Sequence, residues 1–238
     1  MPGRSRTRAT AAPGRVPRNT LSRARIVEAA LALVDAEGLE ALTMPRLAED
    51  LGVGTMSLYR HIEGKDDLLE AVAAHVLNDV VVPPGDPGDW EGRVVGFLRA
   101  LRGQALRHPA LARILANRGI TVAPVLDQLE AVHGILRTAG FTDRDAVRAF
   151  YSLLIYVFGS LLWELPRTQL QSPSDYAAAW QHALEAVDGA RYPNLLELRE
   201  HLATSASADQ FEYGLDQMVS ALRQQVKRGP RRRPSQAH

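Results

Sequence analysis

Hydrophobic residues recur every three to four positions between residues 21 and 77, a spacing that predicts helices rather than strands. The first helix is expected over residues 22–37, because Ser22 is a favourable N-cap and Gly38 follows the last apolar turn. Its apolar face comprises Ile26, Ala29, Ala30, Leu33 and Val34. We expect this helix to brace the two that follow it.

Two short helices joined by a tight turn are predicted within residues 42–65. Thr43 is a suitable N-cap for the first, and Pro45 falls in its first turn, where a missing N–H costs little. The inward face of this helix comprises Leu47, Ala48 and Leu51. Gly52 follows at the position where the helix must end in a left-handed conformation.

The second helix of the pair, residues 55–61, carries an outer face that is poorly suited to a hydrophobic core. Leu58 and Ile62 lie four residues apart and share one face, which anchors the helix. The side chains that point elsewhere are Thr55, Ser57, Tyr59, Arg60 and His61. A short helix with this outer face suits a DNA major groove, although an ordinary helical hairpin with a polar surface has the same pattern.

The next helix, over residues 65–78, is apolar almost all round, which predicts burial on two sides and a role as a connecting rod. Residues 82–89 are dense in proline and glycine and mark a domain boundary. Beyond them every segment has helical spacing, so the chain is expected to be all-α. The expected helices are 90–107, a further one starting at Pro109, 124–138, 143–164 ended by Pro166, 176–187, 195–202 and 209–226.

Composition narrows the class of protein. The chain has 238 residues, 46% of them hydrophobic and 23% charged, as in an ordinary soluble protein with a core of its own. Because it has no cysteine, it has no disulfide framework and no thiolate nucleophile or metal ligand. Residues 1–19 lack the apolar centre of a secretory signal, and the longest apolar run, 153–163, is too short to span a bilayer. We therefore expect a soluble, cytoplasmic protein that does not bind membranes.

The net charge of +1 conceals a segregation along the chain: residues 1–65 carry +3, residues 66–226 carry −7 and residues 227–238 carry +5. A positive head on a negative body would orient the molecule on a polyanion, although a chance distribution also fits. Residues 1–20 hold five arginines and no acid, and we expect a disordered basic arm there, with a second disordered basic tail at 227–238. The arm either follows DNA or is a solvated tail without a role.

Catalytic and metal-binding patterns are absent from the sequence. It has no glycine-rich phosphate loop, no His-Glu-x-x-His and no Gly-x-Ser-x-Gly, and its seven histidines are scattered without ligand spacing. We therefore expect neither an enzyme nor a bound cofactor or metal. Two alternatives stay open at this point: an all-helical enzyme of another type, and a ligand-binding helical bundle that does not bind DNA.

A homodimer is expected from the helix around residues 150–165, which is apolar on opposite sides. One side can face the protomer's own core, and a second copy most simply covers the other. Gly159 and Ser160 would allow two helices to approach closely, and the last helix has a matching apolar stripe. The interface residues expected from these two helices are Leu153, Val157, Leu161, Phe211, Leu215, Met218 and Leu222.

The sequence Leu-Tyr-Arg-His-Ile at 58–62, followed by Gly-Lys-Asp-Asp-Leu-Leu at 64–69, resembles the DNA-binding head of tetracycline-repressor-type (TetR family) regulators. The first helix, with Gly38-Leu39 and Leu42-Thr43 after it, resembles that head too, so the match covers residues 21–77. The segments 191–193 and 211–216 are similar, more loosely, to the ligand-binding body of the tetracycline repressor subgroup. This resemblance implies a three-helix helix-turn-helix domain over 21–81, joined by a connecting helix to a ligand-binding and dimerisation domain over 90–226.

The resemblance implies a ligand-responsive repressor that binds a pseudo-palindromic operator as a homodimer and is released by a small-molecule effector. Carried over by position, the residues expected at phosphates are Thr43, Tyr59, His61 and Lys65, and Thr55 also matches a DNA-contacting position. The residues expected to read bases are Met56, Ser57 and Arg60. Pro45 departs from the family, because the tetracycline repressor has a base-reading arginine there, and Arg46 compensates only in part.

The resemblance also implies an effector cavity between the body helices. The residues expected near it are Leu98, Leu101, Ile114, Phe150, Tyr151, Leu154 and Trp180, although residues of these types are more often plain core than pocket wall. Tetracycline-binding members use a histidine soon after the fourth helix to hold a magnesium–drug chelate. Residues 78–82 contain no histidine here, which argues against tetracycline and against a metal-chelate ligand.

Overall fold

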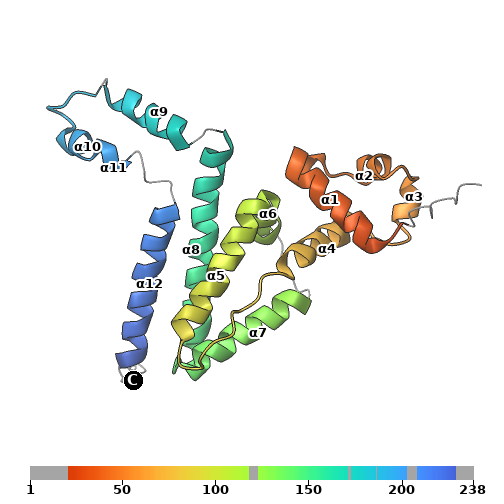
Figure 1. Ribbon diagram of the computed structural model, residues 1–238, viewed down its shortest axis with the longest axis horizontal. Coiled ribbons are helices and arrows are strands. Elements are labelled where there is room, and N and C mark those ends of the chain that lie inside the picture. The colour runs from red at the N-terminus through yellow and green to blue at the C-terminus, as the bar shows by residue number, and fades with distance from the viewer. Residues whose placement is uncertain (1–20, 118–122, 171–172, 186, 203–207, 229–238) are drawn as a thin grey trace, which may run out of the picture.

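The computed structural model describes residues 21–117, 123–170, 173–185, 187–202 and 208–228, and within these ranges every regular element is a helix. A small N-terminal head is connected through one helix to a larger helical body (Figure 1). This is the all-α, two-part architecture predicted from the sequence. The expected basic arm, residues 1–20, and most of the expected basic tail lie outside the described residues.

The head begins with α1 (Arg23–Glu37), whose N-cap Ser22 accepts a hydrogen bond from the Arg25 amide at 3.3 Å. A short 3-10 turn (Leu39–Ala41) leads to α2 (Met44–Asp50), capped by Thr43 as predicted. Gly52 has φ of +66°, the left-handed conformation expected at the end of that helix. The helix α3 (Thr55–Leu58) is shorter than the predicted 55–61, because residues 59–61 continue as turns.

The connecting rod is α4 (Lys65–Leu77), and its predicted burial on two sides is confirmed. On one side it packs against α1 of the head, and on the other it contacts α5, α6 and α7 of the body. Six of its residues are buried: Leu68, Leu69, Val72, Ala73, Val76 and Leu77. A displacement of α4 in the body would therefore be transmitted to the head through packed side chains.

The body is a bundle of five long or medium helices (Figure 1). They are α5 (Trp90–Arg107), α6 (Pro109–Asn117), α7 (Ala123–Thr138), α8 (Asp143–Leu170) and α12 (Ala208–Arg228). The helix α8 contacts α5, α6, α7 and α12, so it is the central element of the bundle. Three further helices, α9 (Pro173–Glu185), α10 (Pro193–Glu197) and α11 (Arg199–Leu202), form an excursion that packs back onto α8 through α9.

Several predicted helix ends in the body are wrong. The helix α8 does not end before Pro166 but continues to Leu170. A proline ring removes one N–H and leaves the carbonyl four residues earlier unpaired, and here that carbonyl belongs to Leu162, whose exposed position allows water to hydrate it. The predicted helix 195–202 is two helices, α10 and α11, and α12 continues to Arg228, so the expected tail begins inside a helix.

The central helix α8 is longer than the predicted helix 143–164, and its apolar part extends beyond the predicted run 153–163. Residues 143–165 form a helix whose most apolar 18-residue window has a mean hydropathy of 1.5, enough by length and composition to cross a bilayer, which the shorter run 153–163 was not. The core helix of a soluble protein passes the same test. Its inner face, including Leu153, Val157 and Leu161, is buried against neighbouring helices of the protomer.

Candidate DNA-binding head and effector cavity

The short helix α3 is fixed to the head by one side and leaves the other at the surface. Leu58 and Ile62 are buried in the core of the head, as their four-residue spacing predicted. Met56 is 77% exposed and Tyr59 is 44% exposed, although both are large side chains that a protein normally buries. Arg60 is also exposed, and its Nη2 donates a hydrogen bond to Ser57 Oγ at 3.2 Å. The exposed face of α3 is therefore an ordered set of aromatic, thioether, hydroxyl and guanidinium groups.

A network of hydrogen bonds around Arg23 holds α3 at a fixed place relative to α4. The Arg23 guanidinium pairs with the Asp67 carboxylate, with Nη1 and Oδ2 3.0 Å apart, and also donates to the carbonyl of His61 at 2.9 Å. The Asp67 carboxylate in turn accepts a hydrogen bond from the Glu63 amide at 2.8 Å. The hydrogen bonds from Arg23 and from the Glu63 amide hold the pKa of Asp67 below its usual value.

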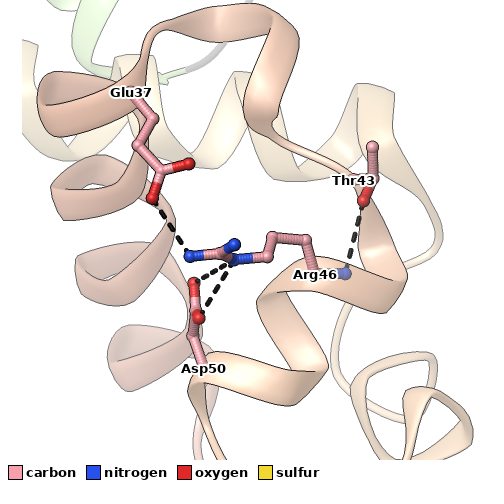
Figure 2. Close-up of polar contacts among 4 residues, drawn as sticks. All are labelled: Glu37, Thr43, Arg46 and Asp50. Carbon is pink, nitrogen blue, oxygen red and sulfur yellow. Dashed lines mark hydrogen bonds and ion pairs between the residues drawn. The ribbon is translucent and has the colours of Figure 1, made fainter.

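Arg46, which was expected to contact DNA, is occupied by two carboxylates (Figure 2). Its Nε donates to Asp50 Oδ1 at 3.1 Å, and its Nη2 donates to Glu37 Oε1 at 3.0 Å. The hydrogen bond to Asp50, assisted by the charges of Asp50 and Glu37, raises the pKa of Arg46. The guanidinium therefore joins α2 to the end of α1, and its charge is neutralised on the head itself.

The other expected DNA-contacting residues lie at the surface on the beginnings of three helices. Thr43 precedes α2 and is exposed, and its hydroxyl oxygen accepts a hydrogen bond from the Arg46 amide at 3.3 Å. Thr55, Ser57 and His61 are partly exposed on and after α3, and Lys65 is exposed at the beginning of α4. The head thus brings together residues that are up to 22 positions apart in the sequence, from Thr43 to Lys65.

A cavity of about 260 Å³ lies between α4 and the body helices α5, α6, α7 and α8. Its lining is almost wholly apolar, with Gln128 and Tyr151 as the residues that carry polar side-chain groups. The lining residues are Leu77, Phe97, Leu101, Leu115, Val125, Gln128, Leu129, Phe150, Tyr151, Leu154 and Phe158. Because Leu77 is the last residue of α4, the cavity touches the rod that leads to the head.

Four of the seven residues expected near an effector cavity line this one: Leu101, Phe150, Tyr151 and Leu154. Leu98 and Ile114 are not among its lining residues, and both side chains are buried elsewhere in the core. Trp180 does not line it either, and the helix α9 that carries it has its main contacts with α8 and α11. Gln128 was missed in the sequence reading, and its place as a polar residue in an apolar stretch of α7 was the available signal.

Comparison with known proteins matches the head and the body each to a known protein family model. Residues 26–72 match the model of bacterial regulatory proteins of the tetR family, and residues 82–226 match that of the tetracyclin repressor-like C-terminal domain. The chain belongs to the TetR family. It is therefore a DNA-binding transcriptional regulator, and the helix-turn-helix of the head is its DNA-binding element.

Relatives of this TetR-family chain include named repressors. It is 34% identical over 221 residues to the transcriptional repressor DrrR1 of Streptomyces coeruleorubidus, covering 88% of this chain and 80% of the relative. It is 34% identical to the class C tetracycline repressor of Escherichia coli, over 60% of this chain and 66% of that one. Among solved structures, ActR of Streptomyces coelicolor in complex with actinorhodin superimposes with a TM-score of 0.77, at 33% identity, over 86% of this chain and 96% of that one.

The apolar residues predicted at the dimer interface of the TetR-family body lie mostly inside the protomer. Most of their side chains are buried there, between α8 and α12, and the remaining two, Met218 and Leu222, pack against the same core. The buried ones are Leu153, Val157, Leu161, Phe211 and Leu215. The five buried residues are covered by the protomer itself, whereas Met218 and Leu222 are only partly buried, so the residue assignment stays a prediction. Because α8 is apolar on two sides, helical spacing alone could not show which side the protomer covers.

The opposite side of α8 carries the exposed apolar residues. Ile155 is 68% exposed, Val147, Tyr151 and Leu162 are about half exposed, and Gly159 lies among them at helical spacing. We call this set, Val147, Tyr151, Ile155, Gly159 and Leu162, the outer stripe of α8. Tyr213 of α12 is also exposed, at 62%.

The contact between α8 and α12 was not visible in the sequence. The Tyr156 hydroxyl of α8 donates to the Phe211 carbonyl at 2.9 Å, and the two rings stack with centroids 5.6 Å apart. The guanidinium carbon of Arg102 on α5 lies 4.4 Å from the centre of the Phe211 ring, and Arg102 pairs with Glu164. Burial raises the pKa of the Tyr156 hydroxyl. These contacts hold α5, α8 and α12 together.

Proposed function

We propose that this TetR-family chain is a repressor that binds a pseudo-palindromic operator as a homodimer and is released when a small molecule enters the body cavity. One observation carries the DNA-binding part of the proposal. The helix α3 and the turns after it are anchored by two buried residues, Leu58 and Ile62, and present Met56, Tyr59 and Arg60 to solvent at the surface of the head. In a helix-turn-helix protein this second helix enters the major groove.

The DNA-contacting roles follow from the chemistry of each exposed group. Arg60 can form two hydrogen bonds to a guanine edge and bonds to Ser57, which lies beside Met56 on α3, so these three are proposed to read bases. Tyr59, His61 and Lys65 are proposed to bind phosphates and set the register of the head. Thr43 joins them, because its hydroxyl oxygen accepts from the Arg46 amide while its proton stays available to a phosphate.

The homodimer is proposed to form through the outer stripe of α8 together with α12. A row of exposed apolar side chains on a central helix is costly in water, and a two-fold symmetric contact would bury the same row from both copies. Gly159, between Ile155 and Leu162 in the stripe, would let the two α8 helices approach closely. Two heads held in this way would meet successive major grooves on one face of the DNA.

The effector is proposed to be a largely apolar molecule that contains aromatic rings. Three phenylalanines, a tyrosine and several leucines line the 260 Å³ cavity, which favours a flat hydrophobic ligand oriented by few polar groups. ActR, with 33% identity, was solved in complex with actinorhodin, which supports a ligand in the same body domain here. Occupation of the cavity would displace α4 and change the separation of the heads, with a coupling of roughly 1–3 kcal/mol.

We place the protein in the cytoplasm, because its proposed operator is chromosomal DNA.

The experiment that tests the function is a gel shift with the intergenic DNA upstream of the protein's own coding region. We expect a complex that survives excess unrelated duplex and that Arg60→Ala weakens by about 1–3 kcal/mol. Equal binding to the upstream DNA and to a scrambled duplex of the same composition would refute the proposal.

A further inference from the structure

A glutamine in the cavity wall holds the end of the rod that leads to the head. Gln128 of α7 lines the cavity, and its side-chain Nε2 donates to the Leu77 carbonyl at 2.8 Å and to the Val80 carbonyl at 2.6 Å. Leu77 is the last residue of α4, and Val80 lies just beyond it and is fully buried. One carboxamide thus bridges the last turn of α4 to the segment that follows.

The two hydrogen bonds of Gln128 are compatible with only one orientation of its carboxamide. Both partners are carbonyl oxygens, so only the NH₂ end of Gln128 can face them, and both of its protons are used. The last carbonyls of a helix have no partner within the helix and need a donor from elsewhere. The Leu77 carbonyl receives one from the Val80 amide at 2.9 Å and a second from Gln128.

We propose that Gln128 is the residue that couples effector binding to the head, by exchanging its hydrogen bonds to the end of α4 for a hydrogen bond to the ligand. The proposal rests on the proposed function and names the regulation of the same cavity. Gln128 is placed between the ligand and the head, since it lines the cavity and its carboxamide bonds to the end of α4. The exchange gives up two hydrogen bonds for one, so the ligand must supply the difference through its apolar contacts with the cavity.

The exchange also defines the ligand. To draw the NH₂ group away from two carbonyls, the ligand must present a hydrogen-bond acceptor, such as a ketone oxygen, beside Gln128. A hydrocarbon of the same shape would fill the apolar part of the cavity and leave the end of α4 in place. The cavity therefore selects ring ketones as inducers over the matching hydrocarbons.

The capping role is tested without ligand or DNA, by hydrogen exchange on Gln128→Leu and Gln128→Glu. Leucine removes both donors, and glutamate keeps the shape but turns carboxylate oxygens toward two carbonyls. The amides of Asn78 and Val80, which bond to the carbonyls of Ala74 and Leu77, report on this end of α4. We expect their exchange to become about tenfold faster in both variants, and to stay as in the wild type in Gln181→Leu, a matched change on α9. Unchanged exchange in both Gln128 variants would overturn the proposal.

The coupling role is tested with a matched pair of probes, 9-fluorenone and fluorene, which differ in one ketone oxygen. In the wild type, we expect fluorenone to accelerate exchange at Asn78 and Val80 and to weaken operator binding at least fivefold, and fluorene to do neither. In Gln128→Leu, fluorenone should add no further weakening. Equal effects of the two probes, no effect of either, or full release of Gln128→Leu by fluorenone would overturn the proposal. A wild-type protein that binds no operator at all would instead refute the proposed function, and the ligand-free exchange result would still decide the capping role.

Discussion

Arg23 and Asp67 join the beginning of α1 to the beginning of α4, with Nη1 of the arginine 3.0 Å from Oδ2 of the aspartate. The same guanidinium donates to the carbonyl of His61, directly after the short helix α3. The pair therefore fixes the DNA-facing helix against both the first helix of the head and the rod from the body. Neither residue needs to contact DNA to set the angle at which α3 is presented.

Asp67→Asn should destabilise the protein near neutral pH by about 1 kcal/mol, a value typical of a partly exposed ion pair. The pKa of Asp67 is lower in the folded protein than in the unfolded chain, where it is about 3.9, so its stabilising contribution is present above that pH. The contribution is lost as the pH falls through the folded-state pKa. Urea unfolding at pH 7 and at successively lower pH should show the difference between wild type and variant shrinking to zero, and Asp79→Asn serves as an exposed control. A difference that grew in acid would contradict this account.

Lys65→Ala and Arg46→Ala should affect DNA binding differently, although each removes one positive charge. Lys65 is exposed at the beginning of α4, and its loss should weaken binding to all duplexes alike and reduce the slope of log K against log salt by about one. Arg46 is already paired with Glu37 and Asp50, so its loss should leave the salt slope nearly unchanged. Fluorescence anisotropy at several salt concentrations measures both slopes. Equal reductions would show that Arg46 leaves its carboxylates to bind phosphate.

Ile155→Glu should convert the dimer to single chains, because it places a charge at the most exposed residue of the outer stripe of α8. Leu126→Glu on α7 is the matched control, since Leu126 is 50% exposed but lies outside the outer stripe. Sedimentation at micromolar concentration should give a dimer mass for the wild type and the control, and a monomer mass for Ile155→Glu. A monomeric wild type, or a dimeric Ile155→Glu, would contradict the proposed interface.

Gly214→Ala should destabilise the body by about 1–3 kcal/mol through overpacking of α8 against α12. A Cβ at Gly214 would lie 2.1 Å from the Tyr156 hydroxyl oxygen and 2.6 Å from the ring carbon that carries it. Gly103→Ala on α5 is the control, because a Cβ there meets nothing within 4 Å and alanine favours a helix by about 0.5–1 kcal/mol. Urea unfolding should therefore move in opposite directions for the two variants, and a stabilising Gly214→Ala would contradict the packing described.

Local signals predicted the head well because its structure is set by neighbouring residues. Ser22 and Thr43 cap the helices that they were expected to cap, and Gly52 takes the left-handed conformation expected of it. Leu58 and Ile62 are buried as their spacing implied. The tie between Arg23 and Asp67 could not be predicted, because its partners are 44 residues apart.

The body was predicted less completely, because its details depend on which helices meet. Helical spacing showed that α8 is apolar on two sides, but the choice of inner side depends on α12, whose contact runs through Tyr156 and Phe211. The cavity depends in the same way on five helices, α4 to α8, that converge. The sequence therefore predicted Leu98, Ile114 and Trp180 in its wall, which do not line it, and missed Gln128, which does. The continuation of α8 through Pro166 is also a property of the folded bundle rather than of the local sequence.

The most direct test of the central claim is a hydroxyl-radical footprint of the protein on the DNA upstream of its own coding region. We expect two related half-sites protected on one face of the duplex, with centres about one helical turn, 34–36 Å, apart or a whole multiple of that spacing. Protection should disappear from both half-sites together in Ile155→Glu, because one head alone lacks the second set of contacts. A footprint with a single unrepeated site, or uniform protection without sequence preference, would contradict the claim that paired α3 helices read this operator.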